Sequence, residues 1–207
     1  SYHPVKHITT GEGGSILTNN SDIDEKVKLL RSHGMIKKED KLNSNEGPWY
    51  YEMHEIGFNY RITDFQCALG INQLKKLNHF IKQRNELALS YNNSFKNIKF
   101  LSTPKIADSI DHAYHLYPIQ IDFGKTKFDK KHFFKLMGKK GISLQVHYIP
   151  IHLQPFYQNN FKFKKGDFPI AENFYLKEVS LPIYPDLLPS EQNLVIRSLK
   201  NIIMNGK

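Results

Sequence analysis

The chain begins with a segment that combines an amine, a hydroxyl and several glycines. The stretch SYHPVKHITTGEGGSILTN places Lys6 between Ser1 and the glycine-rich turn that starts at Gly11. A lysine amine attacks carbonyl carbons when it is held out of bulk water beside groups that lower its pKa, so Schiff-base chemistry would suit this position. The Ser1 hydroxyl and nearby backbone N–H groups could hold a phosphate. From spacing alone, a loop lysine beside a turn is the simpler interpretation.

Two later segments, GFNYR (57–61) and QVHY (145–148), also carry polar side chains that could bind a ligand. Arg61 could serve an anionic substrate or a local carboxylate, and the sequence does not decide between them. His147, taken by itself, is better explained as a structural imidazole than as a ligand contact.

The surrounding patterns predict the elements that position these residues. GGSILTN (13–19) is typical of a short buried strand. The helix that follows has Ser21 as its N-cap, acidic residues in its first turn and Gly34 as its end. Residues 35–57 are polar and irregular and contain the only tryptophan, which predicts a long loop.

A long helix is predicted after this loop. Thr63 and Gln66 form a capping box, and apolar positions at helical spacing continue to about residue 96. A helix of that length commonly bridges two domains. We therefore predict a boundary near residue 97, which gives domains 1–97 and 98–207.

The second domain has the alternating pattern of an α/β unit. A β-α-β pattern is followed by a short helix, a longer helix, another strand and a last amphipathic helix capped by Ser190. The predicted segments are 115–123, 128–140, 141–148, 150–160, 169–178 and 180–184.

Composition limits the possible partners. The 207 residues are 40% hydrophobic, which suffices for a globular core, and they contain neither an apolar run of membrane-spanning length nor a signal-peptide pattern. The formal net charge of +9 suggests an anionic partner, but the lysines are scattered, and the densest group falls on the outer face of helix 128–140, which argues against nucleic acid. The single Cys67 excludes an intramolecular disulfide and fits a reducing cytoplasm.

Taken together, the segments resemble one family. SYHPVKHITTGEGGSILTN, LLRSHG and GFNYRITDFQCALGINQL are similar, in this order, to the DegT/DnrJ/EryC1/StrS family, and QVHYIPIH and SLPIYPDL continue the similarity. The resemblance implies an α/β fold of the fold-type-I pyridoxal-phosphate-dependent transferases, here the C-terminal part of the large domain plus the small C-terminal α/β domain. The SHG, GFNYR and QVHY segments are most similar to members that aminate C4 of a UDP-linked 4-keto-6-deoxy amino sugar, with glutamate as donor, for pseudaminic acid or a related surface glycan.

The resemblance also implies residue roles. Lys6 matches the lysine that holds pyridoxal phosphate as a Schiff base and moves the proton, and Ser1 matches the serine that binds the cofactor phosphate. Asn59 matches an asparagine that reaches the cofactor phosphate of the neighbouring subunit in a homodimer. No metal is implied. The implied substrate contacts are Gln145, Val146, His147 and Tyr148, with Arg61 as a further candidate.

The resemblance further implies that part of the active site lies outside these residues. Family members carry a long segment before the lysine, which supplies the carboxylate that pairs with the pyridine nitrogen and the ring that stacks on the cofactor. We therefore expect this chain to represent the C-terminal half to two-thirds of an aminotransferase and to be inactive alone.

Two other functions fit parts of the pattern. A sugar dehydratase of the same fold is disfavoured because those relatives carry a histidine in place of Lys6. A non-catalytic basic binding or dimerisation module fits the incomplete site. Visible absorption with pyridoxal phosphate, and reduction onto Lys6 by borohydride, would distinguish the aminotransferase from such a module.

Overall fold

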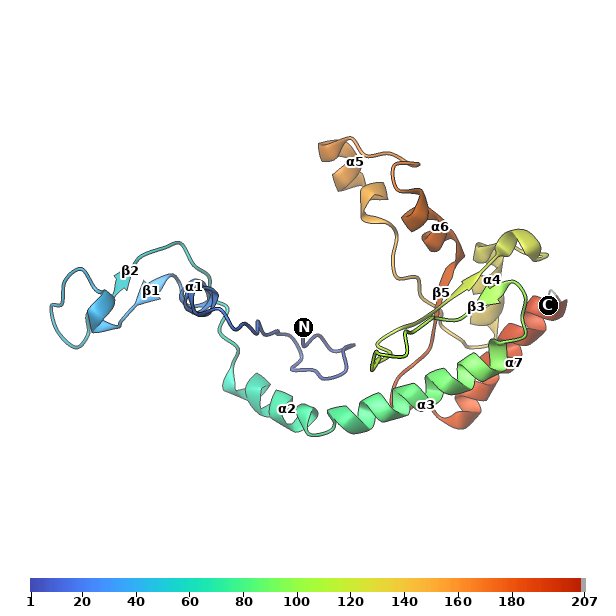
Figure 1. Ribbon diagram of the computed structural model, residues 1–207, viewed down its shortest axis with the longest axis horizontal. Helices are drawn as coiled ribbons and strands as arrows, with labels where there is room; N and C mark the ends of the chain where they lie inside the picture. The colour runs from blue at the N-terminus through green and yellow to red at the C-terminus, as the bar shows by residue number, and fades with distance from the viewer. Residues whose placement is uncertain (206–207) are drawn as a thin grey trace. The chain divides into compact units, whose positions relative to one another are not determined.

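The computed structural model describes residues 1–205, and the chain divides into two compact units, Ser1–Leu77 and a second unit that begins at Asn78 (Figure 1). The second unit starts before residue 97 because helix α3 (Leu77–Phe95) buries Tyr91 and Phe95 in its core. The division of the family fold into domains 1–97 and 98–207 stays a prediction.

The first unit consists of two helices and a small hairpin. Strands β1 and β2 pair antiparallel, with Met35 opposite Met53. The predicted loop 35–57 is therefore irregular except for this hairpin and one 3-10 turn. The elements are α1 (Ser21–Arg31), β1 (Met35–Ile36), η1 (Glu39–Lys41), β2 (Glu52–Met53) and α2 (Asp64–Leu74).

Helix α1 ends as predicted but begins one residue off. Its N-cap is Asn20, whose side-chain oxygen accepts hydrogen bonds from the amides of Asp22 at 2.9 Å and Ile23 at 3.1 Å. The predicted cap, Ser21, is the first helical residue. After the C-cap Ser32, His33 and Gly34 both have positive φ values, 62° and 68°, and the Gly34 N–H donates to the Leu29 carbonyl at 3.0 Å.

The strand predicted at 13–19 is wrong. These residues join no ladder, and Ile16 and Leu17 are 66% and 92% exposed. A strand needs a ladder of hydrogen bonds to a neighbour, and no segment within residues 1–205 forms such a ladder with this one, although the Tyr2 N–H donates to the Gly13 carbonyl.

The helix predicted from Thr63 to about residue 96 forms as two helices. The capping box is confirmed: the Thr63 hydroxyl accepts from the Gln66 amide, and the Gln66 side-chain oxygen accepts from the Thr63 amide at 3.1 Å. The break falls at Lys75 and Lys76, where the Lys76 N–H donates to the Gln73 carbonyl at 3.0 Å in a turn tighter than the α-helix.

The second unit packs helices around a three-stranded antiparallel sheet with the order β3-β4-β5. Its elements are α3, β3 (Leu101–Ser102), β4 (Tyr117–Ile121), η2 (Phe123–Lys125), α4 (Lys130–Lys139), η3 (Ile151–Leu153), α5 (Pro155–Phe161), α6 (Pro169–Lys177), β5 (Glu178–Leu181) and α7 (Pro189–Asn205).

Fully buried and half-buried residues alternate along β4, and the buried ones belong to the hydrophobic core of the second unit. Tyr117, Ile119 and Ile121 are fully buried, and they cluster with side chains of α3, α4, β5 and α7. Figure 1 shows α3 and α7 passing beneath the sheet, and the Gln192 side chain of α7 donates to the Leu87 carbonyl of α3 at 2.8 Å.

No helix within residues 1–205 is long and apolar enough to cross a bilayer.

Two strand predictions in this unit need correction. The strand predicted at 180–184 lies at 178–181, because Pro182 has no N–H with which to continue the ladder. The strand predicted at 141–148 is reduced to a single bridge between Gln145 and Ser180.

The start of the last helix also differs from the prediction. Helix α7 begins at Pro189, so the predicted cap Ser190 lies inside the helix. The Glu191 carboxylate accepts the Leu188 N–H at 2.9 Å instead.

Candidate active site

Lys6 lies in an N-terminal loop that closes on itself. The Tyr2 N–H donates to the Gly13 carbonyl at 2.8 Å, and the Thr10 N–H donates to the Tyr2 carbonyl at 3.0 Å. Between these closures, the Lys6 N–H donates to the His3 carbonyl at 2.9 Å, and the Lys6 residue is half-buried. These hydrogen bonds fix the backbone from which the Lys6 side chain extends.

Helix α2 anchors this loop. The Gln66 side-chain nitrogen donates to the Glu12 carbonyl at 2.9 Å, so the capping-box residue also holds the loop. Thr10 is buried against Gly70, where a β-carbon would lie 2.9 Å from the Thr10 methyl group. Glycine at position 70 thus permits the close approach of loop and helix.

The side chains of this N-terminal segment include groups that can bind an aldehyde and a phosphate. The Lys6 amine can bond to a carbonyl carbon, and the exposed Ser1 hydroxyl, which accepts the His3 N–H at 3.5 Å, can donate to an anionic oxygen. Ser1 directly precedes the closing residue Tyr2, so both groups come from one N-terminal segment, as the sequence resemblance implies for pyridoxal phosphate.

Asn59 is held beside the end of α1. It forms an antiparallel bridge with Ser32, and its neighbours reinforce the pairing: the Phe58 N–H donates to the Leu30 carbonyl at 2.7 Å and the Tyr60 N–H to the Arg31 carbonyl at 2.9 Å. Asn59 itself is exposed, and so is Arg61 further along the same segment.

In the second unit, the segment 145–148 runs along the edge of β5. The Ser180 N–H donates to the Gln145 carbonyl at 2.9 Å, and the Gln145 N–H donates back at 3.3 Å. Val146 and His147 are half-buried, whereas Tyr148 is 72% exposed and packs edge-on against the His147 ring.

A buried carboxylate and a hydroxyl hold His147. Its backbone N–H donates to Glu178 Oε2 at 3.0 Å, and its ring Nδ1 lies 2.8 Å from Ser180 Oγ. The sequence interpretation missed Glu178 and Ser180 as site residues. The available signal was an acidic and a hydroxyl side chain alternating with apolar residues in the buried strand EVSL.

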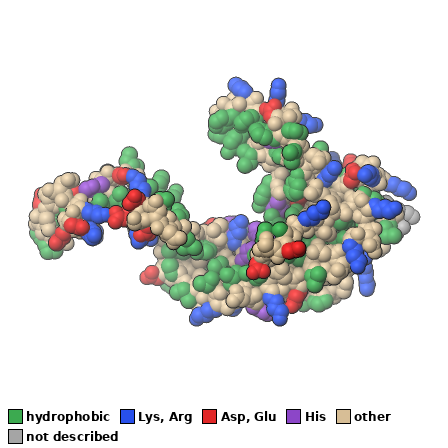
Figure 2. All heavy atoms as spheres, in the orientation of Figure 1, with side chains coloured by type: hydrophobic (Ala, Val, Ile, Leu, Met, Phe, Trp, Pro, Cys, Tyr) green, Lys and Arg blue, Asp and Glu red, His purple; other side chains and the backbone are tan. Residues whose placement is uncertain are grey.

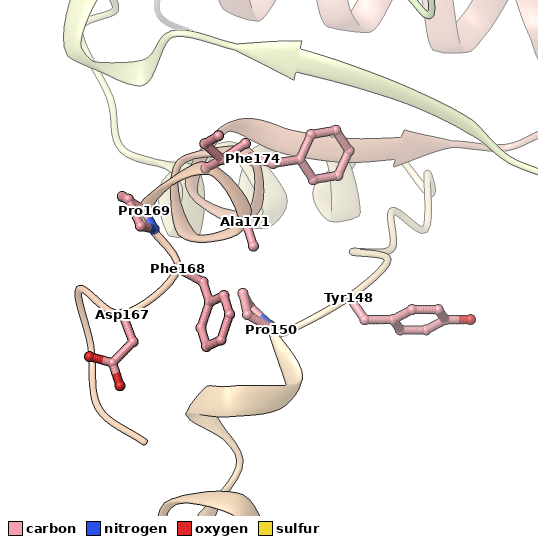
Figure 3. Close-up of a pocket in the computed structure, with 8 residues that line it drawn as sticks. Tyr148, Pro150, Asp167, Phe168, Pro169, Ala171 and Phe174 are labelled. Atoms are coloured by element: carbon pink, nitrogen blue, oxygen red, sulfur yellow. The ribbon is translucent and has the colours of Figure 1, made fainter. Parts of the chain in front are cut away.

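A cavity of about 620 Å³ lies beside this segment, against α6 (Figure 3). In the close-up, Phe168 and Pro150 face one another, whereas the Tyr148 ring points away from the α6 side chains. Apolar side chains gather over α5 and α6, as Figure 2 shows. The lining residues are Tyr148, Pro150, Asp167, Phe168, Pro169, Ile170, Ala171 and Phe174.

The predicted site residues thus form two groups, one in each compact unit. Ser1, Lys6, Asn59 and Arg61 belong to the first unit, and the segment 145–148 belongs to the second.

Comparison with known proteins gives one consistent result. The model of the DegT/DnrJ/EryC1/StrS aminotransferase family matches residues 1–200. An uncharacterised protein of Methanocaldococcus jannaschii is 44% identical over 207 residues, which are 100% of this chain and 54% of that protein. The UDP-4-amino-4,6-dideoxy-N-acetyl-beta-L-altrosamine transaminase of Campylobacter jejuni is 39% identical over 209 residues, covering 100% of this chain and 52% of that protein.

A solved structure shows similarity to the same family of proteins. Helicobacter pylori PseC, an aminotransferase involved in the biosynthesis of pseudoaminic acid, has a TM-score of 0.87 and 35% identity over 99% of this chain and 52% of its own. This similarity confirms the predicted fold class. The chain spans about half the length of the relatives that it matches.

Proposed function

The chain belongs to the DegT/DnrJ/EryC1/StrS aminotransferase family, and from this premise we propose that the full-length protein moves an amino group from glutamate to C4 of a UDP-linked 4-keto-6-deoxy amino sugar. The observation that carries the proposal is the hydrogen-bonded loop that holds Lys6, with Ser1 directly before its closing residue Tyr2. The 39% identity of the whole chain to the Campylobacter jejuni altrosamine transaminase supports the sugar class.

Pyridoxal phosphate is the proposed cofactor. When bound, it supplies an aldehyde that carries the amino group and a ring that withdraws electrons from the reacting carbon. Lys6 would anchor it covalently and then, as the released amine, move a proton between two carbon atoms. Ser1 would donate its hydroxyl hydrogen to a phosphate oxygen.

The proposed substrate contacts are the segment 145–148 and Arg61. We assign the segment 145–148 to contacts with the sugar, because His147 is held rigidly and Tyr148 is exposed beside it. Arg61 is exposed and would supply a positive charge for the diphosphate.

A homodimer is the proposed assembly, with Asn59 reaching the cofactor phosphate of the partner. The first unit exposes aromatic side chains in the segment that leads up to and includes the neighbours of this residue, and aromatic residues are enriched in protein interfaces. They are Trp49, Tyr51, Phe58 and Tyr60. Sedimentation of the full-length protein at micromolar concentration should show a dimer, and a monomer there would contradict this assembly.

Covalent labelling tests the function. The full-length protein, incubated with pyridoxal phosphate, should absorb visible light, and borohydride should leave a stable pyridoxyl group on Lys6 that peptide mass spectrometry locates. The Lys6→Ala variant is the control and should carry no specific label. Labelling spread over surface lysines, with none preferred, would contradict the proposal and favour a non-catalytic binding module.

A further inference from the structure

A buried carboxylate determines how His147 hydrogen bonds. Glu178 is 0% exposed and Ser180 is 4% exposed, on the strand beside His147. Glu178 Oε2 accepts the backbone N–H of His147 at 3.0 Å, and Glu178 Oε1 accepts the Ser180 hydroxyl at 2.6 Å. Ser180 Oγ lies 2.8 Å from His147 Nδ1. The three residues therefore form a closed hydrogen-bonded ring.

Strand register explains why these residues meet. Gln145 pairs with Ser180, so continuing the antiparallel register would place His147 opposite Glu178. At that point the Glu178 side chain, not its backbone carbonyl, accepts the His147 N–H. The ladder ends there, and the imidazole is left beside the Ser180 hydroxyl.

The direction of each bond fixes the position of the ring hydrogen. An ionised carboxylate only accepts hydrogen bonds, so the single hydroxyl hydrogen of Ser180 is directed to Glu178. Ser180 Oγ can then only accept from the imidazole, which requires a hydrogen on His147 Nδ1. Burial lowers the pKa of Lys130, and the nearby Glu178 carboxylate opposes that change.

We propose that Glu178 and Ser180 are positioning residues that hold neutral His147 as the Nδ1–H tautomer, so that its Nε2 accepts a hydrogen bond from a hydroxyl or N–H group of the ligand. The identity of the ligand as a nucleotide sugar rests on the proposed function. The assignment of the tautomer does not rest on the proposed function, because it follows from the hydrogen bonds among Glu178, Ser180 and His147.

Glu178→Gln gives a sharp test, because it should reverse the tautomer. The His147 backbone N–H still needs an acceptor, so the glutamine carbonyl oxygen should face it and the amide NH2 should face Ser180. Ser180 would then accept from the amide and donate to His147 Nδ1, which moves the ring hydrogen to Nε2.

The measurement is imidazole nitrogen NMR of the full-length protein at about pH 8, where an ordinary imidazole is neutral. The wild type should show a protonated Nδ1 and an unprotonated Nε2 for His147, and Glu178→Gln should show the opposite. Ser180→Ala should lose the wild-type preference, which keeps the test valid if Glu178→Gln fails to fold. Glu172→Gln, which alters the pair with His152, is the matched control and should leave the His147 signals unchanged. A wild-type His147 protonated at Nε2 would overturn the proposal.

Kinetics of the full-length protein test the ligand contact. Glu178→Gln should raise KM for the nucleotide sugar by about three- to tenfold, the effect of one hydrogen bond, while the glutamate half-reaction stays unchanged. An unchanged KM would contradict the proposed hydrogen bond between His147 Nε2 and the ligand. If Lys6 labelling failed but the tautomer reversed as expected, the proposed function would fail and the positioning role would stand.

Discussion

Gly34 and Gly57 approach so closely that a β-carbon on Gly57 would lie 2.3 Å from the Gly34 amide nitrogen. The same added carbon would lie 2.8 Å from the Leu30 carbonyl oxygen. This contact lets the segment after the hairpin lie against the end of α1, where Asn59 pairs with Ser32. The position of a proposed cofactor-binding residue therefore depends on two glycines outside the site.

Gly57→Ala should destabilise the first unit by about 1–3 kcal/mol, the usual cost of overpacking against backbone. Hydrogen exchange at the Phe58 and Tyr60 amides should accelerate, because these amides bond to the end of α1. Gly138→Ala in α4 is the control: its β-carbon meets nothing within 4 Å, so it should be neutral or slightly stabilising. Equal exchange rates in wild type and Gly57→Ala would contradict the prediction.

Glu52→Gln should loosen the loop between η1 and β2. The Glu52 carboxylate accepts the Asn43 N–H at 2.9 Å and the Ser44 N–H at 3.1 Å. The Asn43 hydrogen bond is the main cause that lowers the pKa of Glu52 to about 2, with further bonds from His54, Ser44 and Tyr50.

Because this folded-state pKa lies below the ordinary one, the carboxylate orders the loop fully above the ordinary glutamate pKa of about 4.3. The ordering is lost only as the pH falls toward 2. Amide exchange at Asn43 and Ser44 should therefore remain slow at about pH 4 in the wild type. It should be fast in Glu52→Gln, whereas Glu46→Gln, an exposed change in the same loop, should match the wild type.

Glu172→Gln should lower the melting temperature of the second unit near neutral pH. Glu172 Oε1 lies 2.8 Å from His152 Nε2 and accepts the Gly166 N–H at 2.7 Å, which ties η3 to α6. These bonds, that of His152 first, lower the pKa of Glu172.

A lowered folded-state pKa gives stability that is present above the ordinary glutamate pKa and lost as the pH falls through the lowered value. The difference in melting temperature between wild type and variant should therefore narrow on acidification. Glu86→Gln, at an exposed position on α3, should show no comparable pH-dependent difference. A difference that stays constant with pH would contradict the role of the carboxylate charge.

Arg84→Met should destabilise the second unit by about 2–4 kcal/mol. The buried Arg84 guanidinium donates to the carbonyls of Tyr114, His115 and Ile183, and burial lowers its pKa. Methionine keeps much of the volume but removes these donors. Urea denaturation measures the effect, and Arg197→Met, at an exposed site on α7, should change stability little. Similar losses in both variants would contradict the prediction.

Lys6→Ala in the full-length protein should lower amine transfer from glutamate at least about a hundredfold, while the melting temperature stays close to that of the wild type. Lys28→Ala, an exposed change on α1, should retain activity. Comparable rates for Lys6→Ala and wild type would contradict the assigned role of Lys6. We also expect no turnover by the 207-residue chain alone, because it spans about half the length of its relatives, and robust turnover would contradict this prediction.

The sequence by itself determined most of the helices and the motif around Lys6. The capping box of Thr63 and Gln66 and the glycine end of α1 involve bonds between residues a few positions apart, so local sequence carries them. The motif segments were sufficient to identify the family, which the match over residues 1–200 confirms.

Only the tertiary structure decided which of the predicted strands form and what surrounds His147. A strand forms where a partner is available, and segment 13–19 has none within the described residues, whereas segment 141–148 keeps a single bridge. Glu178 and Ser180 lie more than thirty positions from His147 in sequence, with separations of 31 and 33. Their hydrogen bonds exist because folding brings the two segments into antiparallel register, which no periodicity within either segment encodes.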